Sequence, residues 1–271
     1  MKSAIAAVLL CLVSAIGTSG QAQVQTVPVA ITSDYYAKPK VLVLHALNNS
    51  GKDIAGYTII IGHKNADGKM DQGRTWTATD MLSVLITAQM AKDPAASESI
   101  RQQYLGNKIF NDAGTGIFFA GRTRDITLTG IDSGSEFDAA AGVIFYADGT
   151  YDRQDEDTFK QMLASRQHEL QRTTYENELI RNALADPANE HPVTGVLTEL
   201  NKRRVEEMDK PGQHFPMDLS NSELRSMQQP LVYGPDKGKS ERERLTQYVQ
   251  DQEKRVELMT PHCHLEIALK P

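Results

Sequence analysis

Cysteine is scarce in this sequence, which has two among its 271 residues, Cys11 and Cys263. Cys11 lies in an N-terminal segment that we expect to be removed, so one cysteine would remain and no internal disulfide could form. Stability must then come from packing. The apolar run around Cys11 is shorter than the roughly 20 residues that a helix needs to cross a bilayer, and no stop-transfer charges follow it. We therefore predict no transmembrane segment after cleavage of the N-terminal segment.

The first residues have the pattern of a secretory signal peptide. Lys2 gives a short basic start, residues 4–16 are apolar, and the small residues of GTSGQAQ follow. We predict cleavage after Ala22, so that residues 1–22 are a signal peptide and the protein is periplasmic or extracellular. A membrane anchor and a lipoprotein are the alternatives. A lipobox needs a small residue before its cysteine, and a leucine stands there.

Positive charge is in the minority, with 29 basic against 35 acidic residues and a formal net charge of -6. Loss of Lys2 with the signal peptide makes the chain one unit more negative. General affinity for nucleic acid or anionic lipid is therefore not expected. About 250 residues remain after cleavage, enough for one large domain or two smaller ones.

The local motifs of common catalytic sites are also missing. There is no G-x-S-x-G nucleophile elbow and no G-x-x-x-x-G-K-[ST] phosphate loop. GPDKGKS (residues 234–240) has its glycines too close together, and we interpret it as a linker. Asp155, Glu156 and Asp157 could supply an acid and a base, but the helix dipole alone accounts for carboxylates at a helix start. We predict no catalytic residue and no cofactor.

Two segments resemble metal sites. HKNADGKMDQGR (residues 63–74) is spaced like a calcium loop, but His63 stands at the first ligand position and Arg74 where a bidentate glutamate is needed. We expect an Asp-Gly hairpin turn there instead, and another in ADGTYD (residues 147–152).

The C-terminal HCHLEIALKP alternates polar and apolar residues, which predicts a half-buried strand that could return to the N-terminal sheet. His262 and His264, with Glu266 as a third ligand, would share one face and could bind zinc or copper. An exposed polar face is the plainer interpretation. Cys263 would lie on the opposite, buried face.

Short β-rich segments occupy the first half of the chain, separated by clusters of Gly, Asp and Ser. The polar NNSGKD between two of them predicts the turn of a hairpin, and its Asn48 also begins an N-x-S glycosylation acceptor that we do not expect to be used. The expected strands are residues 25–32, 41–47, 54–62, 116–120, 125–129 and 141–146. Their spacing is typical of an antiparallel sandwich.

Helical patterns appear twice. Thr79 and Pro94 can start two short helices within residues 80–105, inserted between strands, although TWTATDMLSVLI could instead be a strand. After YADGTY the composition changes to Gln, Glu, Arg and Leu, so we place a domain boundary there. Three helices are expected beyond it, at about residues 155–184, from 192 or 194 to 208, and at residues 240–259. The first is indicated by residues that recur at helical spacing: Phe159, Met162, Leu163, Arg166, Leu170, Ile180 and Leu184.

Residues 41–70, which begin with VLVLHALNNSGKDIAGYTIIIGHKNADGK, resemble the core hairpin of the FxLYD-type immunoglobulin-like domains of secreted bacterial proteins. The resemblance implies a sandwich and a bacterial envelope setting, and it carries over no functional residue. The expected fold is α+β, with an immunoglobulin-like sandwich over residues 24–150 and a helical region over 155–271. We expect a non-enzymatic binding or scaffolding module with a protein partner in the envelope. A hydrolase with dispersed catalytic residues, or metal handling by His262 and His264, are the alternatives.

Overall fold

The computed structural model describes residues 27–38, 40–63, 74–112, 116–130, 137–208, 222–229, 232–234 and 236–265. The expected signal peptide lies outside these residues, as does most of the calcium-like segment. Within them the protein is mixed α+β with antiparallel sheets, as predicted. No helix in this part of the chain has the length and apolar character needed to span a membrane.

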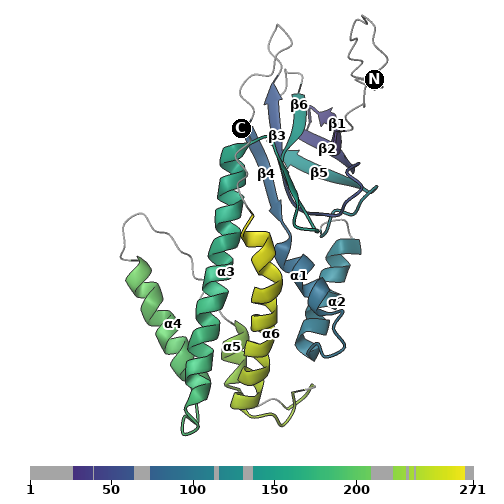
Figure 1. The fold of residues 1–271 in the computed structure, drawn as a ribbon. Helices are drawn as coiled ribbons and strands as arrows, with labels where there is room; N and C mark the ends of the chain where they lie inside the picture. The colour runs from purple at the N-terminus through teal and green to yellow at the C-terminus, as the bar shows by residue number, and fades with distance from the viewer. Residues whose placement is uncertain are drawn as a thin grey trace, which may run out of the picture.

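Two antiparallel sheets occupy one end of the molecule (Figure 1). The first sheet has the order β1-β2-β5, formed by Val29–Tyr36, Val41–Asn48 and Thr123–Thr129. The second has the order β4-β3-β6-β7, formed by Arg74–Asp80, Ile54–His63, Phe137–Tyr146 and Tyr151–Arg153.

Four predicted strands agree with β2, β3, β5 and β6 to within a few residues. The strand expected at residues 25–32 begins later and is β1. The strand expected at residues 116–120 is wrong, because only Phe118 pairs there, in an isolated bridge with Ile54. For TWTATDMLSVLI, both the strand and the helix interpretation are partly right, because its first part belongs to β4 and its second part to a helix.

The predicted hairpin between residues 41–47 and 54–62 is also wrong. β2 and β3 lie in different sheets, so NNSGKD carries the chain from one sheet to the other. Asn48 fixes this crossing, because its Nδ2 donates to the carbonyl oxygens of Lys52 and Phe118, both at 2.8 Å. Its Oδ1 accepts from the backbone N and the Oγ of Ser50. Strands that bury apolar faces from opposite sides of one core cannot also pair edge to edge.

One hydrophobic core joins the two sheets. Alternation in β2 places Leu42, Leu44 and Ala46 inward with 0–1% exposure, and Ile54 and Ile59 of β3 face them from the second sheet. Helix α1 (Leu82–Met90) adds buried side chains to the same core. Helix α2 (Glu98–Asp112) follows it, and both helices precede β5 in the chain and lie at one end of the sheets (Figure 1).

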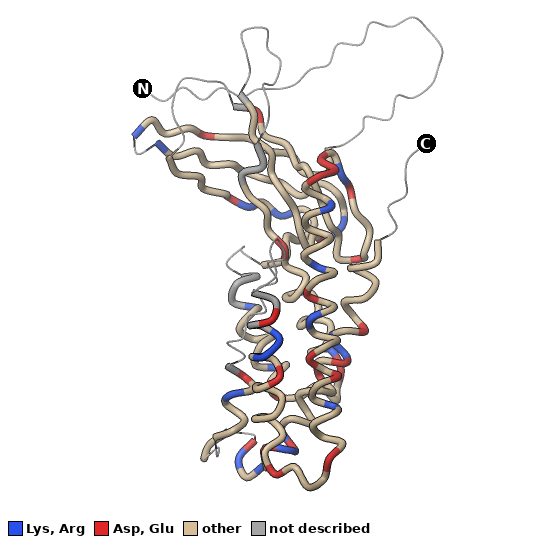
Figure 2. Tube along the Cα trace, turned by 90° about the vertical axis from the view of Figure 1, so that its left-hand side faces the viewer, with Lys and Arg blue, Asp and Glu red and all other residues tan. Residues whose placement is uncertain are grey.

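Four further helices form an arm that extends away from the sheets (Figures 1 and 2). They are α3 (Glu156–Ala185), α4 (Pro192–Met208), α5 (Ser222–Met227) and α6 (Glu241–Cys263). Asp155 caps α3 by accepting from the backbone N of Thr158 at 3.1 Å. A second core fills the arm, built from Ile180, Val193, Val196, Leu200, Leu224, Leu245 and Val249.

The end of α6 corrects two predictions. We expected the helix to stop before Pro261 and a strand to follow, but the helix continues to Cys263. Proline removes a single backbone donor, and here the last turn is held by burial: Met259, His262 and Cys263 are 0%, 6% and 0% exposed. The alternation in HCHLEIALKP is therefore no strand pattern up to Cys263, and residues 266–271 lie outside the described part.

Candidate functional site

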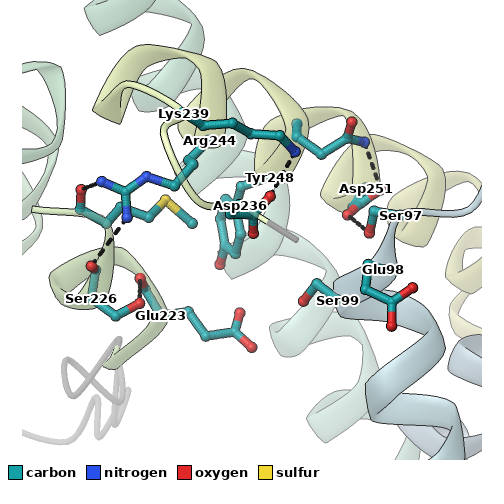
Figure 3. A pocket seen from close by; sticks show the side chains of 12 residues that line it. Ser97, Glu98, Ser99, Glu223, Ser226, Asp236, Lys239, Arg244, Tyr248 and Asp251 are labelled. Carbon is teal, nitrogen blue, oxygen red and sulfur yellow. Dashed lines mark hydrogen bonds and ion pairs between the residues drawn. The ribbon is translucent and has the colours of Figure 1, made fainter. Parts of the chain in front are cut away.

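A polar cavity of about 220 Å³ lies between α2, α5 and α6, in the arm and away from the sheets (Figure 3). Side chains from three helices and one turn converge on it. They are Ser97, Glu98, Ser99, Glu223, Ser226, Met227, Asp236, Lys239, Arg244, Gln247, Tyr248 and Asp251.

Helix α6 supplies one wall through its periodicity. Arg244, Gln247, Tyr248 and Asp251 follow each other at spacings of three, one and three residues, so they share one face of the helix. Ser97, just before α2, closes the opposite side. Its Oγ donates to Asp251 Oδ2 at 2.5 Å, and the backbone N of Ile100 donates to the same Oγ at 3.3 Å.

The turn before α6 supplies the pair Asp236 and Lys239. The backbone N of Lys239 donates to the carbonyl of Asp236 at 3.1 Å, and the Lys239 ammonium lies 2.6 Å from Asp236 Oδ1. This turn belongs to the segment that we interpreted as a linker. It is part of the cavity wall instead.

Most of the carboxylates at the cavity have neutral hydrogen-bond partners. Glu98 accepts from Gln102 at 2.6 Å, and Glu223 accepts from Gln103 at 3.1 Å. Asp251 accepts from Ser97 and from Gln247. Among the described residues, Asp236 is the one cavity carboxylate with an ion-pair partner.

Arg244 does not neutralise these carboxylates, although it is 8% exposed and lines the cavity. Its Nη1 donates to the Ser226 carbonyl at 3.3 Å and its Nη2 to the Met227 carbonyl. These are the last residues of α5, where a cation also interacts favourably with the helix dipole. Arg244 therefore holds α5 against α6 and leaves the cavity with an excess of negative charge.

Asp251 lies between this cavity and a second one of about 190 Å³, which shares Gln247 and Asp251 with it. Burial raises the pKa of the Asp251 carboxyl, while the hydrogen bonds from Ser97 and Gln247 oppose that shift. A carboxyl group perturbed in this way inside a cleft is a candidate for ligand contact.

The short contact between Ser97 and Asp251 does not make a nucleophile. Activation of a serine needs a general base within hydrogen-bond reach, oriented by a third group. No histidine is present among the described residues that line the cavity. The residues at the cavity are suited to bind a cation by charge and hydrogen bonding.

A second polar cluster joins the arm to the sheets. Arg166 of α3 forms a bidentate ion pair with Asp80 at the end of β4, with Nε–Oδ2 and Nη2–Oδ1 distances of 2.7 and 2.8 Å. Arg166 is 3% exposed, and its guanidinium lies 4.0 Å from the ring centre of Phe145. Gly56 makes room for it, because a Cβ there would lie 2.9 Å from Nη2. We call Gly56, Asp80, Phe145 and Arg166 the joint.

The predicted metal-binding arrangement of His262 and His264 on one strand face is wrong. His262 is buried in the last turn of α6, whereas His264 is exposed and follows the helix, so the two do not share a strand face. The described residues contain no group of three His, Cys, Asp or Glu side chains placed to hold a metal ion. Glu266 lies outside that part of the chain.

The other singled-out residues have structural roles. Asn48 is 0% exposed and both of its amide hydrogens are used, so it is not open to glycosylation. ADGTYD is the turn between β6 and β7, as predicted, with Gly149 at a φ of +85°. Asp155 caps α3, and Glu156 and Asp157 lie in its first turn.

None of the cavity residues was predicted as a site. One sequence signal could have indicated them: α6 has a polar stripe at helical spacing, formed by Arg244, Gln247, Tyr248 and Asp251. In the structure this stripe faces other helices, where apolar residues are the usual choice. Sequence alone does not indicate which helices face it.

No family model matches the chain, and no curated protein matches it. A solved structure of a hypothetical protein from Peptoclostridium difficile 630 is similar over 52% of this chain and 92% of that chain, with 12% sequence identity and a TM-score of 0.26. At this TM-score the likeness carries no argument about fold or function.

Proposed function

We propose that this protein is an exported, non-enzymatic binding module of the bacterial cell envelope, and that the cavity in its arm binds a basic side chain of a partner protein. In this proposal an immunoglobulin-like sandwich, with α1 and α2 as its helical insertion, carries the arm. Removal of the signal peptide and a periplasmic or extracellular location are parts of the same proposal.

Two observations support the immunoglobulin-like reading. The chain crosses between the sheets after β2, and side chains from both sheets share one core, as in a sandwich. The crossing falls in the segment whose strand, polar link and second strand resemble the FxLYD type. The crossing residue Asn48 thus gives the NNSGKD segment a structural role.

The observation that carries the binding proposal is the charge of the cavity. Glu98, Glu223 and Asp251 are three carboxylates without an ion pair among the described residues, although the charge of Arg255 acts on Asp251. The two cations that line the cavity are bound elsewhere, Lys239 to Asp236 and Arg244 to the end of α5. A lysine or arginine side chain that entered would gain charge-assisted hydrogen bonds that the free protein lacks. Charge complementarity of this kind favours a basic partner and disfavours an acidic one.

The proposal is tested with N-acetyl-arginine-N-methylamide as the probe and NMR amide shifts as the readout. We expect binding with a Kd on the order of millimolar, as suits a single side chain, and shifts confined to amides around the cavity. The citrulline analogue has the same shape without the charge and should produce no saturable shifts.

The matched variants are Glu98→Gln with Glu223→Gln, which keep shape and remove charge. They should weaken probe binding by about fivefold, since two exposed ion pairs of about 0.5 kcal/mol each are lost. Glu190→Gln and Asp157→Asn, which neutralise carboxylates elsewhere in the chain, serve as controls and should leave probe binding unchanged. Equal shifts with the citrulline analogue, or shifts spread over the whole surface, would refute the cation site.

A further inference from the structure

The imidazole of His262 lies buried where the end of α6 meets the turn between β6 and β7. It is 6% exposed, and a Cβ added at Gly149 of that turn would lie 3.9 Å from its Cε1 and Nδ1. The ring therefore rests against the backbone of the turn. In the described part of the chain, neither ring nitrogen has a hydrogen-bond partner, so no acceptor stands ready for a second proton.

The charges that face His262 come from three elements. Arg166 comes from α3, Asp80 from β4 and Asp148 from the β6–β7 turn. Asp80 is already bound bidentately by Arg166, and Asp148 Oδ2 already lies 2.8 Å from the ammonium of Lys52. Both nearby carboxylates are thus neutralised, and a proton on His262 would add an uncompensated positive charge beside a guanidinium.

We propose that His262 makes the contact between α6 and the sheets sensitive to acid: protonation of its imidazole releases the last turn of α6 from the β6–β7 turn. Pro261 has no N–H, so the last turn of α6 lacks one backbone donor. Besides the bonds within the helix, the turn makes a 3.2 Å bond from His264 N to the Thr260 carbonyl, a 3.0 Å bond from Gln167 Nε2 to the Cys263 carbonyl and a 3.4 Å contact from Cys263 Sγ to the Arg166 carbonyl. Local opening of such a helix end costs less than global unfolding.

The direction of the pH effect follows from the environment. Burial, and after it the charge of Arg166, lower the pKa of His262 below its ordinary value. A released His262 takes up a proton near its ordinary pKa of about 6.5, whereas the buried one resists it. The released state therefore gains population as the pH falls below that value and loses it as the pH rises.

Cys263 reports the release, because its thiol is 0% exposed and lies beside His262. With Cys11→Ser in the background, Cys263 is the sole thiol of the chain. Its rate of reaction with 4,4′-dithiodipyridine is measured at pH 7.5 and at pH 5. Each rate is divided by the rate of N-acetylcysteine at the same pH, which corrects for the pH dependence of the thiol reaction itself. We expect the corrected rate to rise severalfold at pH 5, up to a limit of about thirtyfold set by the ordinary histidine pKa.

His262→Phe should abolish the rise, because it fills the same space and cannot be protonated. His264→Phe alters the exposed neighbour and should leave the rise intact. An unchanged corrected rate in the parent, or an equal rise in His262→Phe, would overturn the proposal. If His262→Phe does not fold by circular dichroism, the His262 Cε1 proton is titrated by NMR in the parent. Titration at an ordinary pKa without loss of the Gly149 contact would overturn it as well.

Discussion

At the scale of single residues, Asn48 shows how one side chain sets the path of the chain. It is fully buried and makes four hydrogen bonds across the crossing between the sheets. Asn48→Ala should lower the free energy of unfolding by about 2–3 kcal/mol, because buried partners lose their hydrogen bonds. The neighbouring, exposed Asn49→Ala should change it by less than about 0.5 kcal/mol. Urea unfolding measures both, and equal effects would show that the crossing does not depend on this amide.

The joint depends on the buried ion pair between Arg166 and Asp80. Asp80→Ala leaves the guanidinium of Arg166 buried without its counter-ion, and should cost about 3–5 kcal/mol of unfolding free energy. The exposed pair Arg181 and Glu253, with a 2.5 Å contact, is the matched control, and Arg181→Ala should cost about 1 kcal/mol or less. A loss from Asp80→Ala no larger than that control would contradict a structural role for the joint.

His45 provides a pH effect of opposite sign to that of His262. Its Nδ1 lies 2.7 Å from Asp125 and its Nε2 lies 3.4 Å from Asp34, on the outer face of the first sheet. The hydrogen bond to Asp125 is the largest cause of the raised pKa of His45; burial opposes the shift, and the hydrogen bond to Asp34 adds to it. Its stabilisation is therefore complete below the ordinary pKa of about 6.5 and is lost as the pH rises through the folded value.

Because His45 is partly exposed, its contribution should stay below about 1 kcal/mol. The difference in unfolding free energy between the parent and His45→Gln should be larger at pH 5.5 than at pH 8.5. A difference that does not change with pH would show that the two aspartates do not stabilise the charged ring.

At the scale of elements, α6 depends on its first turn. Ser240 and Glu243 form a capping box, in which the Ser240 hydroxyl accepts from Glu243 N at 3.2 Å and Glu243 Oε2 accepts from Ser240 N at 2.7 Å. Ser240→Ala should cost about 1 kcal/mol, and Ser240→Gly only a few tenths. Thermal unfolding distinguishes the two, and equal losses would mean that the cap bond contributes little.

Local signals predicted the starts of α3, α4 and α6 and the centres of β2, β3, β5 and β6. They did not predict the starts of the two inserted helices, because α1 begins at Leu82 and α2 at Glu98, beyond the expected Thr79 and Pro94. Asp155 and Ser240 begin α3 and α6 as their capping chemistry requires, and alternation marks the buried face of β2. The failures are non-local. Whether NNSGKD closes a hairpin or crosses between sheets depends on which core the second strand joins, and Pro261 stays helical because the sheets and α3 bury the turn around it.

The cavity could not be predicted for the same reason. Its residues come from α2, α5, α6 and a turn, separated by up to 154 positions in the chain, as between Ser97 and Asp251. Each residue looks ordinary by itself: a helix cap, a solvated carboxylate, a linker lysine. What makes a candidate site is the meeting of α2 and its preceding residue with α5 and α6, through the Gln103–Glu223 and Ser97–Asp251 hydrogen bonds. This meeting brings to one cavity three carboxylates that have no ion pair among the described residues.

At the scale of the whole molecule, the joint and the cavity have complementary roles. The joint fixes the 30-residue helix α3 to the second sheet, and α6 packs along α3 and returns its C-terminal turn to the sheets (Figures 1 and 2). In the proposed binding function, the joint holds the cavity at a fixed distance from the two sheets. Loss of the joint should therefore reduce binding to an intact partner more than binding of the small arginine probe.

The most direct test of the proposed function is photo-crosslinking in native envelope fractions. The exported chain carries p-benzoylphenylalanine at Ser99, beside the cavity, or at Asp157, far from it. We predict a defined protein adduct from Ser99 that is lost when Glu98→Gln and Glu223→Gln are introduced and retained with His45→Gln, and no such adduct from Asp157. Recovery of the chain alone as a monomer from both positions, or an adduct that persists after the two glutamine substitutions, would contradict the proposal.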